Sequence, residues 1–123
     1  MKNRDFSFNA IDWLADSGLS QVSPSARGVW IDLLCRMWLS DNPGHLVLNV
    51  GGVAPALPEV AKACRATVAE TRDCLKELER YGVISRTPDG IIFSPRMVRE
   101  HAAGAKAIKT GRMGGNARLK SKR

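Results

Sequence analysis

The strongest hydrophobic pattern in the chain lies between residues 23 and 44. Its apolar side chains recur at spacings of three and four residues, the period of a helix with one buried face, at Val29, Trp30, Leu33, Leu34, Met37 and Trp38. Ser23 followed by Pro24 is typical of a helix start, and the run from Asp41 to Gly44 is typical of a stop. The pattern predicts a helix over residues 24–40 that is buried along one broad face.

A second helical pattern fills residues 57–84 and is interrupted by a tight turn. The first half places small or apolar side chains on one helix face, at Val60, Ala61 and Cys64. The second half begins at Thr67, which forms a capping box with Glu70 three residues later. Gly82 ends this helix, and its inner face consists of Thr71, Cys74, Leu75 and Leu78. We expect two helices joined by a turn.

Shorter runs in the second half of the chain predict strands. Residues 83–87 and 91–95 are two β-type runs joined by Pro88, Asp89 and Gly90, which is a hairpin signal. Residues 45–49 form another strand-like run, directly after the turn that ends the long helix.

The N-terminal segment predicts a short helical turn. Asn9 is a suitable helix cap, and the turn that follows it carries Ile11, Trp13 and Leu14. Phe6 and Phe8 precede this turn, so we expect them to lie in an arm or a short strand.

The order helix, strand, helix, turn, helix, hairpin is typical of a winged helix-turn-helix, in which the second helix of the pair enters the major groove of DNA. The spacing within residues 54–94 resembles that of bacterial winged-helix regulators, at Val60, Ala61, Thr67, Leu75, Leu78, Gly82, Val83 and Ile84. Arg65 stands where a glycine is usual in that pattern, and Thr71 where a valine is usual. Another small α+β domain with two amphipathic helices and a hairpin is the alternative.

Charge divides the chain into two parts. Residues 1–100 contain 12 basic and 12 acidic side chains. Residues 101–123 contain no acidic side chain and seven basic ones, at Lys106, Lys109, Arg112, Arg118, Lys120, Lys122 and Arg123. A chain of 123 residues fits one domain. We therefore predict the α+β class, mainly helical, with a winged helix-turn-helix domain and its N-terminal extension over residues 1–100. A basic tail follows over residues 101–123, and we expect it to be flexible because its glycines disfavour a continuous helix.

The residue types that carry catalysis or bind metals show no suitable arrangement. Cys35, Cys64 and Cys74 form no CxxC pair, and His45 and His101 lack neighbouring ligands. We expect the cysteines to be reduced core residues and the histidines to be surface residues. We expect no enzyme activity, no catalytic residue, no metal and no cofactor. Neither a secretion signal nor a membrane-spanning run stands out, so we expect a cytoplasmic protein.

The predicted helix that begins at Thr67 supplies the candidate DNA contacts. Arg72 is the candidate base reader, because a guanidinium can donate two hydrogen bonds to a guanine edge. Arg65 and Thr67 are candidates for phosphate contacts at the turn and the helix start, and Arg86 for a contact from the wing. The outward side of the helix carries Val68, Ala69, Arg72 and Lys76. Residues 54–94 hold six basic and six acidic side chains, so we expect most phosphate contacts to come from the tail.

Three sequence segments resemble a known family. They are WLAD at residues 13–16, the pattern Ser-x-x-Ala-Arg-Gly-x-Trp-x-x-Leu-Leu-x-x-x-Trp from Ser23 to Trp38, and Gly-Arg-x-Gly-Gly-x-Ala-Arg from Gly111 to Arg118. These segments are similar to the YdaU-like and replisome-organiser winged-helix proteins of phages and prophages. The resemblance implies a role in phage replication initiation or helicase loading inside a bacterial host. The implied partners are double-stranded origin DNA, a helicase or its loader, and a second copy of the chain.

Two other functions are compatible with the same residues. One is a winged-helix transcriptional regulator, which uses the same DNA contacts. The other is a replisome adaptor that binds a protein partner, or a second copy, through the helix at 24–40 and the aromatic N-terminus. Aromatic side chains are common anchors at such interfaces, and this segment carries Trp13, Trp30 and Trp38. In that case the charged helix after Thr67 is an ordinary solvated surface.

Overall fold

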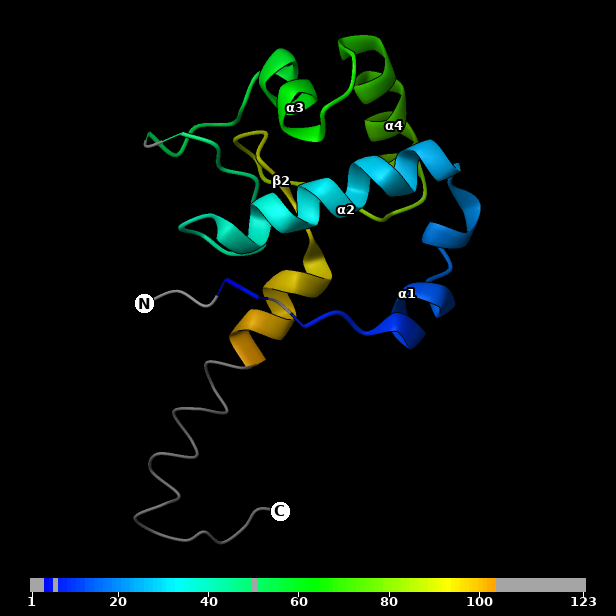
Figure 1. Ribbon diagram of the computed structural model, residues 1–123. Helices are drawn as coiled ribbons and strands as arrows, with labels where there is room; N and C mark the ends of the chain where they lie inside the picture. The colour runs from blue at the N-terminus through cyan, green and yellow to red at the C-terminus, as the bar shows by residue number, and fades with distance from the viewer. Residues whose placement is uncertain (1–3, 6, 50, 104–123) are drawn as a thin grey trace, which may run out of the picture.

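The computed structural model describes residues 4–5, 7–49 and 51–103, which form a mainly helical α+β structure (Figure 1). The predicted fold class is confirmed at this level. The elements are α1 (Ala10–Ala15), the 3₁₀ turn η1 (Leu19–Gln21), α2 (Pro24–Leu39), α3 (Leu57–Cys64), α4 (Val68–Arg80), β1 (Ser85–Arg86) and β2 (Ile92–Phe93). A further helix occupies residues 95–103. Among the described residues, no helix has both the length and the apolar character needed to cross a membrane.

The long helix α2 runs through the middle of the molecule, and the other elements pack around it (Figure 1). The Ser23 hydroxyl caps it by accepting a hydrogen bond from the Ala26 backbone N–H at 3.1 Å, with Pro24 in the first helical position. Most of the predicted apolar face is buried, at Val29, Trp30, Leu33, Leu34 and Met37, and Trp38 is partly buried. The predicted helix and its buried face are both confirmed.

Helices α3 and α4 are joined by a tight turn at Arg65, whose backbone is left-handed with φ 58°. The turn therefore has the conformation that favours glycine. Thr67 then caps α4: its hydroxyl accepts from the Glu70 N–H at 3.0 Å, and its own N–H donates to Glu70 Oε1 at 2.8 Å. The predicted pair of helices and the capping box are confirmed.

The inner faces of α3 and α4 complete the core above α2 (Figure 1). The buried residues of α3 include Val60, Ala61 and Cys64, and those of α4 are Thr71, Cys74, Leu75 and Leu78. A second connection joins α4 to the start of α2. The Glu77 carboxylate accepts hydrogen bonds from the backbone N–H and the hydroxyl of Ser23, at 2.9 and 2.8 Å. Side-chain burial and these two bonds together fix how α4 lies on α2.

The predicted hairpin follows α4 directly and is confirmed, although it is short. Ser85 pairs with Phe93 and Arg86 with Ile92 in an antiparallel register. Gly90 closes the turn with φ 88°, and its N–H donates to the Thr87 carbonyl at 2.8 Å. Each strand has only two residues.

Two predictions are wrong. Residues 45–49 form no strand: His45 makes an isolated bridge to Phe93, and the Leu46 N–H donates to the Ile92 carbonyl at 2.8 Å. The Val47 N–H then bonds back to the His45 carbonyl, which turns the chain away from the hairpin.

Cys35 is exposed, because it lies on the outer side of α2, beside the buried stripe. Cys64 and Cys74 are buried as predicted.

The helix over residues 95–103 has no counterpart in the sequence prediction. Ser94 caps it by accepting from the Met97 N–H at 3.1 Å, and Met97 is buried in the core. Gly44, with φ 89°, lies directly against this helix: a Cβ at that position comes within 2.6 Å of Val98 Cγ2. The close approach of the two backbone segments therefore requires glycine. The helix continues beyond residue 100 and so includes the first residues of the predicted basic tail, which starts at residue 101.

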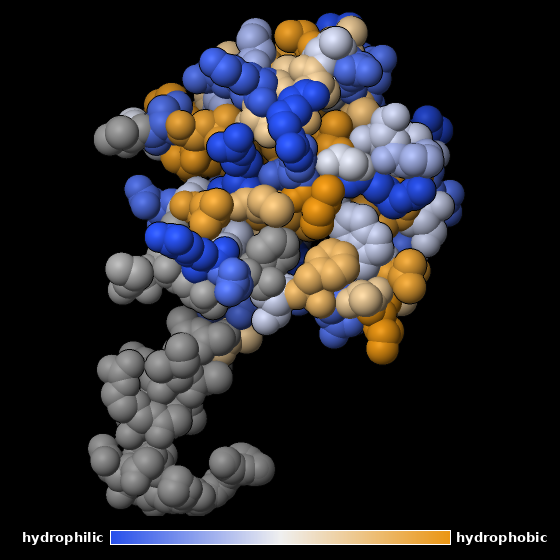
Figure 2. All heavy atoms as spheres, viewed as in Figure 1, coloured by the Kyte–Doolittle hydropathy of each residue, from blue (hydrophilic) through white to orange (hydrophobic). Residues whose placement is uncertain are grey.

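The N-terminal helical turn is confirmed as α1, but it leaves its apolar side exposed. Asn9 Oδ1 accepts from the Asp12 N–H at 3.0 Å, as a cap does. The Phe8 and Trp13 rings lie 5.3 Å apart, whereas Ile11 and Leu14 are each 77% exposed. Figure 2 shows the resulting apolar patch over α1, at the lower right. Phe6 lies outside the described residues.

Thr71 is the polar side chain that fits the core least well. It is fully buried, and its hydroxyl has no hydrogen-bond partner within the described part of the chain. An unsatisfied buried hydroxyl is destabilising, and valine has almost the same shape. We therefore expect Thr71→Val to raise the free energy of unfolding by roughly 1 kcal/mol, as measured by urea denaturation.

Thr67→Val, on the same helix, is the matched control for this change. It also removes a threonine hydroxyl, but here the hydroxyl caps α4. We expect a loss of about 1 kcal/mol in the free energy of unfolding. A destabilised Thr71→Val protein would show that the buried hydroxyl has a partner after all.

Candidate nucleic-acid interface

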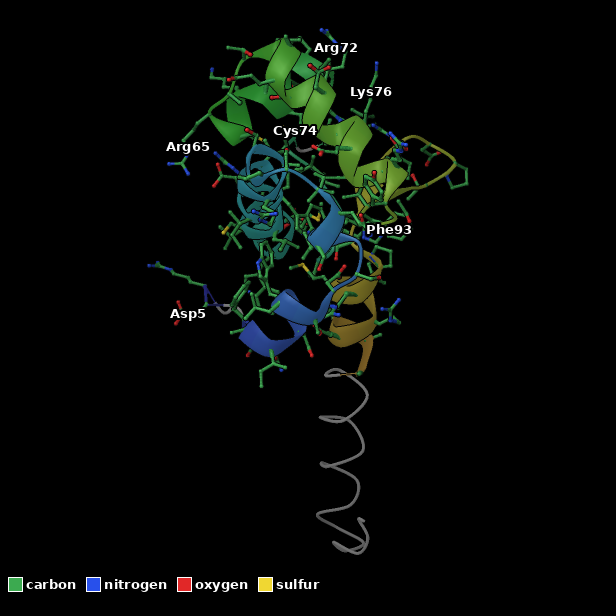
Figure 3. The ribbon with its side chains drawn as sticks, turned by 90° about the vertical axis from the view of Figure 1, so that its right-hand side faces the viewer. Asp5, Arg65, Arg72, Cys74, Lys76 and Phe93 are labelled. Atoms are coloured by element: carbon green, nitrogen blue, oxygen red, sulfur yellow. The ribbon has the colours of Figure 1, made fainter. Side chains whose placement is uncertain are left out.

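The outward side of α4 is the centre of the candidate interface. All four residues predicted to point away from the core are exposed: Val68, Ala69, Arg72 and Lys76. Figure 3 shows Arg72 and Lys76 projecting from α4 away from the body of the molecule. Their positions follow from helix geometry, because the buried residues Thr71, Leu75 and Leu78 occupy the opposite side. The structure thus brings these four candidates together on one surface.

Arg65 points to a different side of the molecule. Its guanidinium lies 2.9 Å from Asp32 Oδ1 of α2, and the hydrogen bond and charge of Asp32 raise the pKa of Arg65. Figure 3 accordingly shows Arg65 on the α2 side, away from Arg72 and Lys76. The structure therefore does not group this predicted phosphate contact with the α4 residues. Asp32 was missed as its partner because the two residues are distant in sequence.

The start of α4 already holds a negative charge. Glu70 Oε1 accepts the Thr67 N–H, and the Thr67 hydroxyl accepts the Glu70 N–H. A helix N-terminus attracts anions through its free N–H groups, and the Glu70 carboxylate satisfies part of that attraction. Thr67 is thus a structural cap first, and a phosphate near it must also approach the Glu70 carboxylate.

Arg86 in β1 lies beside α4. Its Nε donates to Glu79 Oε2 at 3.0 Å, and both side chains remain partly exposed. This ion pair attaches the hairpin to the helix on the outer surface. Arg86 is therefore placed next to the candidate interface, but with its charge already matched by a carboxylate.

The seven basic candidates of the tail lie outside the described residues: Lys106, Lys109, Arg112, Arg118, Lys120, Lys122 and Arg123. Their placement relative to α4 stays a prediction. The cationic surface of the described interface therefore consists mainly of Arg72 and Lys76, with Arg80 near the end of α4, 5.4 Å from the Tyr81 ring centre.

Other chemistry is sparse in the described residues. They contain no group of three or more His, Cys, Asp or Glu side chains placed to hold a metal ion. Burial raises the pKa of the Cys64 thiol to about 11, and burial also raises that of Cys74. Both thiols are therefore protonated at neutral pH and poor nucleophiles. His45 is partly buried, not fully on the surface, and stacks on Phe93 at 5.4 Å.

Comparison with known proteins adds nothing to this geometry: no protein-family model matches the chain, and no curated protein or solved structure matches it either.

The cap of α4 predicts a pH effect. Hydrogen bonding from the Thr67 backbone N–H, and then from its side chain, lowers the pKa of Glu70. A carboxyl whose pKa is lowered by folding adds stability above its unfolded-state pKa and loses it as the pH falls through the folded-state pKa. We therefore expect Glu70→Gln to reduce the loss of unfolding free energy between about pH 5 and pH 3. Urea denaturation at a series of pH values measures the free energy of unfolding of each variant.

Asp73→Asn is the control, because it removes one carboxylate from the same helix and leaves the cap intact. The effect of Glu70→Gln should be small, since Glu70 is solvent-exposed. Identical pH profiles for the wild type and Glu70→Gln would contradict the stabilising role of the charged cap.

Proposed function

We propose that this protein binds double-stranded DNA without catalysis, through a winged helix-turn-helix made of α3, α4 and the β1–β2 hairpin. One observation carries the proposal. Helix α4 buries one side against α2 and α3 and leaves Arg72 and Lys76 exposed on the other, immediately before a hairpin attached to the same helix. This is the arrangement by which a recognition helix enters the major groove while the wing packs beside it.

The fold supports some of the proposed DNA contacts better than others. Arg72 is the candidate base reader and Lys76 a phosphate contact, and no described side chain makes an ion pair with either. Arg65 and Arg86 must exchange a carboxylate, Asp32 or Glu79, for a phosphate before they can contribute. Phosphate contacts supply most non-specific affinity, so the proposal assigns most of that affinity to the basic residues of the tail.

The resemblance to replisome-organiser proteins suggests the biological setting. On that basis the proposed role is the initiation of phage or prophage DNA replication in the host cytoplasm, with a helicase or its loader as partner. A transcriptional regulator would use the same α4 contacts. Selection from a random duplex library tests for a preferred site, and the position of that site at an origin or a promoter separates these two roles.

The adaptor function has one observation in its favour. Ile11 and Leu14 of α1 are each 77% exposed, and apolar side chains gathered on a surface are typical of protein interfaces. An adaptor needs no DNA contact. If the intact protein does not bind duplex DNA at low salt, the adaptor function is favoured over the DNA-binding function.

The α4 contacts can be tested by mutation. We expect Arg72→Ala and Lys76→Ala each to weaken binding to a random duplex at low salt, and Arg72→Ala to cost about 1–3 kcal/mol at a selected site if it reads a base. Arg99→Ala is the matched control, because Arg99 is an exposed arginine on the helix 95–103, on the opposite side of α2 from α4. Fluorescence anisotropy with labelled duplex measures all three. Equal effects at Arg72 and Arg99 would refute the role of α4.

The contribution of the tail can be measured from the salt dependence. Replacing its seven basic residues with glutamine keeps the chain length and removes the charge. If all of them contact phosphate, the slope of log K against log salt should become less steep by about six. An unchanged slope would show that the affinity comes from the body of the protein.

A further inference from the structure

A cavity of about 610 Å³ is lined mainly by the N-terminal segment with α1, by α2 and by the helix 95–103, and by no residue of α4. Its walls are rich in aromatic side chains: Phe8 from the N-terminal arm, Trp13 from α1, and Trp30 and Trp38 from α2. Leu34 and Met97 also line it. A cavity of this size with mainly apolar walls and a few polar groups is typical of a binding site. The proposed DNA contacts use none of these residues.

The polar groups of the cavity carry a net negative charge. Its lining includes the carboxylates of Asp12, Asp16 and Glu100, and Arg96 is the one lysine or arginine among the described lining residues. Arg96 pairs with Asp12 at 3.2 Å, so their charges cancel. Asp16 accepts the Leu19 N–H at 3.0 Å and makes no ion pair with a described side chain. Aromatic rings beside unmatched carboxylates are suited to a cationic occupant with apolar side chains.

The chain itself supplies a segment of that chemistry. The helix 95–103 contributes Glu100 and His101 to the cavity wall, and the 20 residues that follow it contain seven basic side chains and no acidic one. Apolar side chains are spaced among these charges, at Ile108, Met113 and Leu119. A segment joined to the wall of its own site has an effective concentration in roughly the millimolar range. A complementary contact whose dissociation constant lies below about one millimolar is then mostly occupied.

We propose that this aromatic, acidic cavity is the docking site of the chain's own basic segment, residues 104–123. Lysine and arginine side chains of the segment lie against the aromatic rings and near Asp16 and Glu100, and its apolar side chains enter the cavity. The docking itself does not depend on DNA binding. Its consequence does rest on the proposed function: docked basic residues are withheld from phosphate, so DNA and the cavity compete for the same segment.

The tryptophans give a specific readout of docking, because all three tryptophans of the chain line this cavity. The experiment uses the whole 123-residue chain with Cys35→Ser, since Cys35 is the exposed cysteine and Cys64 and Cys74 are buried. A nitroxide label is attached at Thr110→Cys in one protein and at Ser121→Cys in another. A nitroxide quenches tryptophan fluorescence at contact distance. We expect quenching at low salt without DNA, and its loss at high salt.

Reversing a charge at the cavity distinguishes docking from mere proximity, in which the label is near the tryptophans only because the segment is covalently attached to the domain. We expect Glu100→Lys to remove most of the quenching and Glu100→Gln to remove part of it. Asp73→Lys is the matched control, because it reverses an exposed carboxylate on α4, away from the cavity, and should leave the quenching intact. Far-ultraviolet circular dichroism checks that each variant is folded. Because no DNA is present, a negative result here leaves the DNA-binding proposal standing, and a failure to bind DNA leaves this result unaffected.

Three outcomes would overturn the proposal. The first is the absence of quenching in the labelled parent proteins at low salt. The second is equal quenching in Glu100→Lys and Asp73→Lys, which means that the label is near the tryptophans only through its tether. The third is quenching that rises with protein concentration, which means that the segment enters the cavity of a second copy.

Discussion

Helix α4 has to bury one side against α2 and α3 while it carries charged residues on most of the rest of its surface. Burying one leucine side chain contributes about 1.5–3 kcal/mol, more than an exposed ion pair usually does. Leu75 and Leu78 are almost fully buried, so their packing contributes more to the rotation of the helix than an exposed ion pair does. Arg72 and Lys76 are exposed because of this constraint, before any DNA contact is considered.

Ser23 connects this constraint to the rest of the fold. The same hydroxyl caps α2 through the Ala26 N–H and donates to Glu77 of α4. The sequence pattern predicts the first role, because a cap depends on residues next to one another in the chain. It cannot predict the second, because 54 positions separate Ser23 from Glu77. The start of the core helix thus also determines where α4 lies.

The difference between contacts of sequence neighbours and contacts of distant residues also explains which parts of the structure could be predicted. Helix periodicity, the Thr67 cap and the hairpin turn at Gly90 are local properties, and all were predicted. The prediction of a strand at residues 45–49 is wrong because strand pairing requires the chain to run beside Phe93 for several residues. That path is not a local property of the sequence. The helix 95–103 was missed because its burial depends on the close approach of Gly44. Within the candidate site, the positions on α4 were predictable, whereas the carboxylates that hold Arg65 and Arg86 come from other elements.

Ion pairs also explain part of the equal number of basic and acidic side chains in residues 1–100. Part of the balance is local, because Arg65, Arg86 and Arg96 each lie against one carboxylate, from α2, α4 and α1 respectively. Exposed pairs of this kind add little to stability, so a phosphate could replace the carboxylate without unfolding the domain. At these three arginines an incoming anion therefore competes with the protein's own carboxylates, whereas no described side chain makes an ion pair with Arg72 or Lys76 of α4. Under the proposed DNA-binding function, selectivity would then depend on shape and on α4, while overall affinity would depend on residues 104–123.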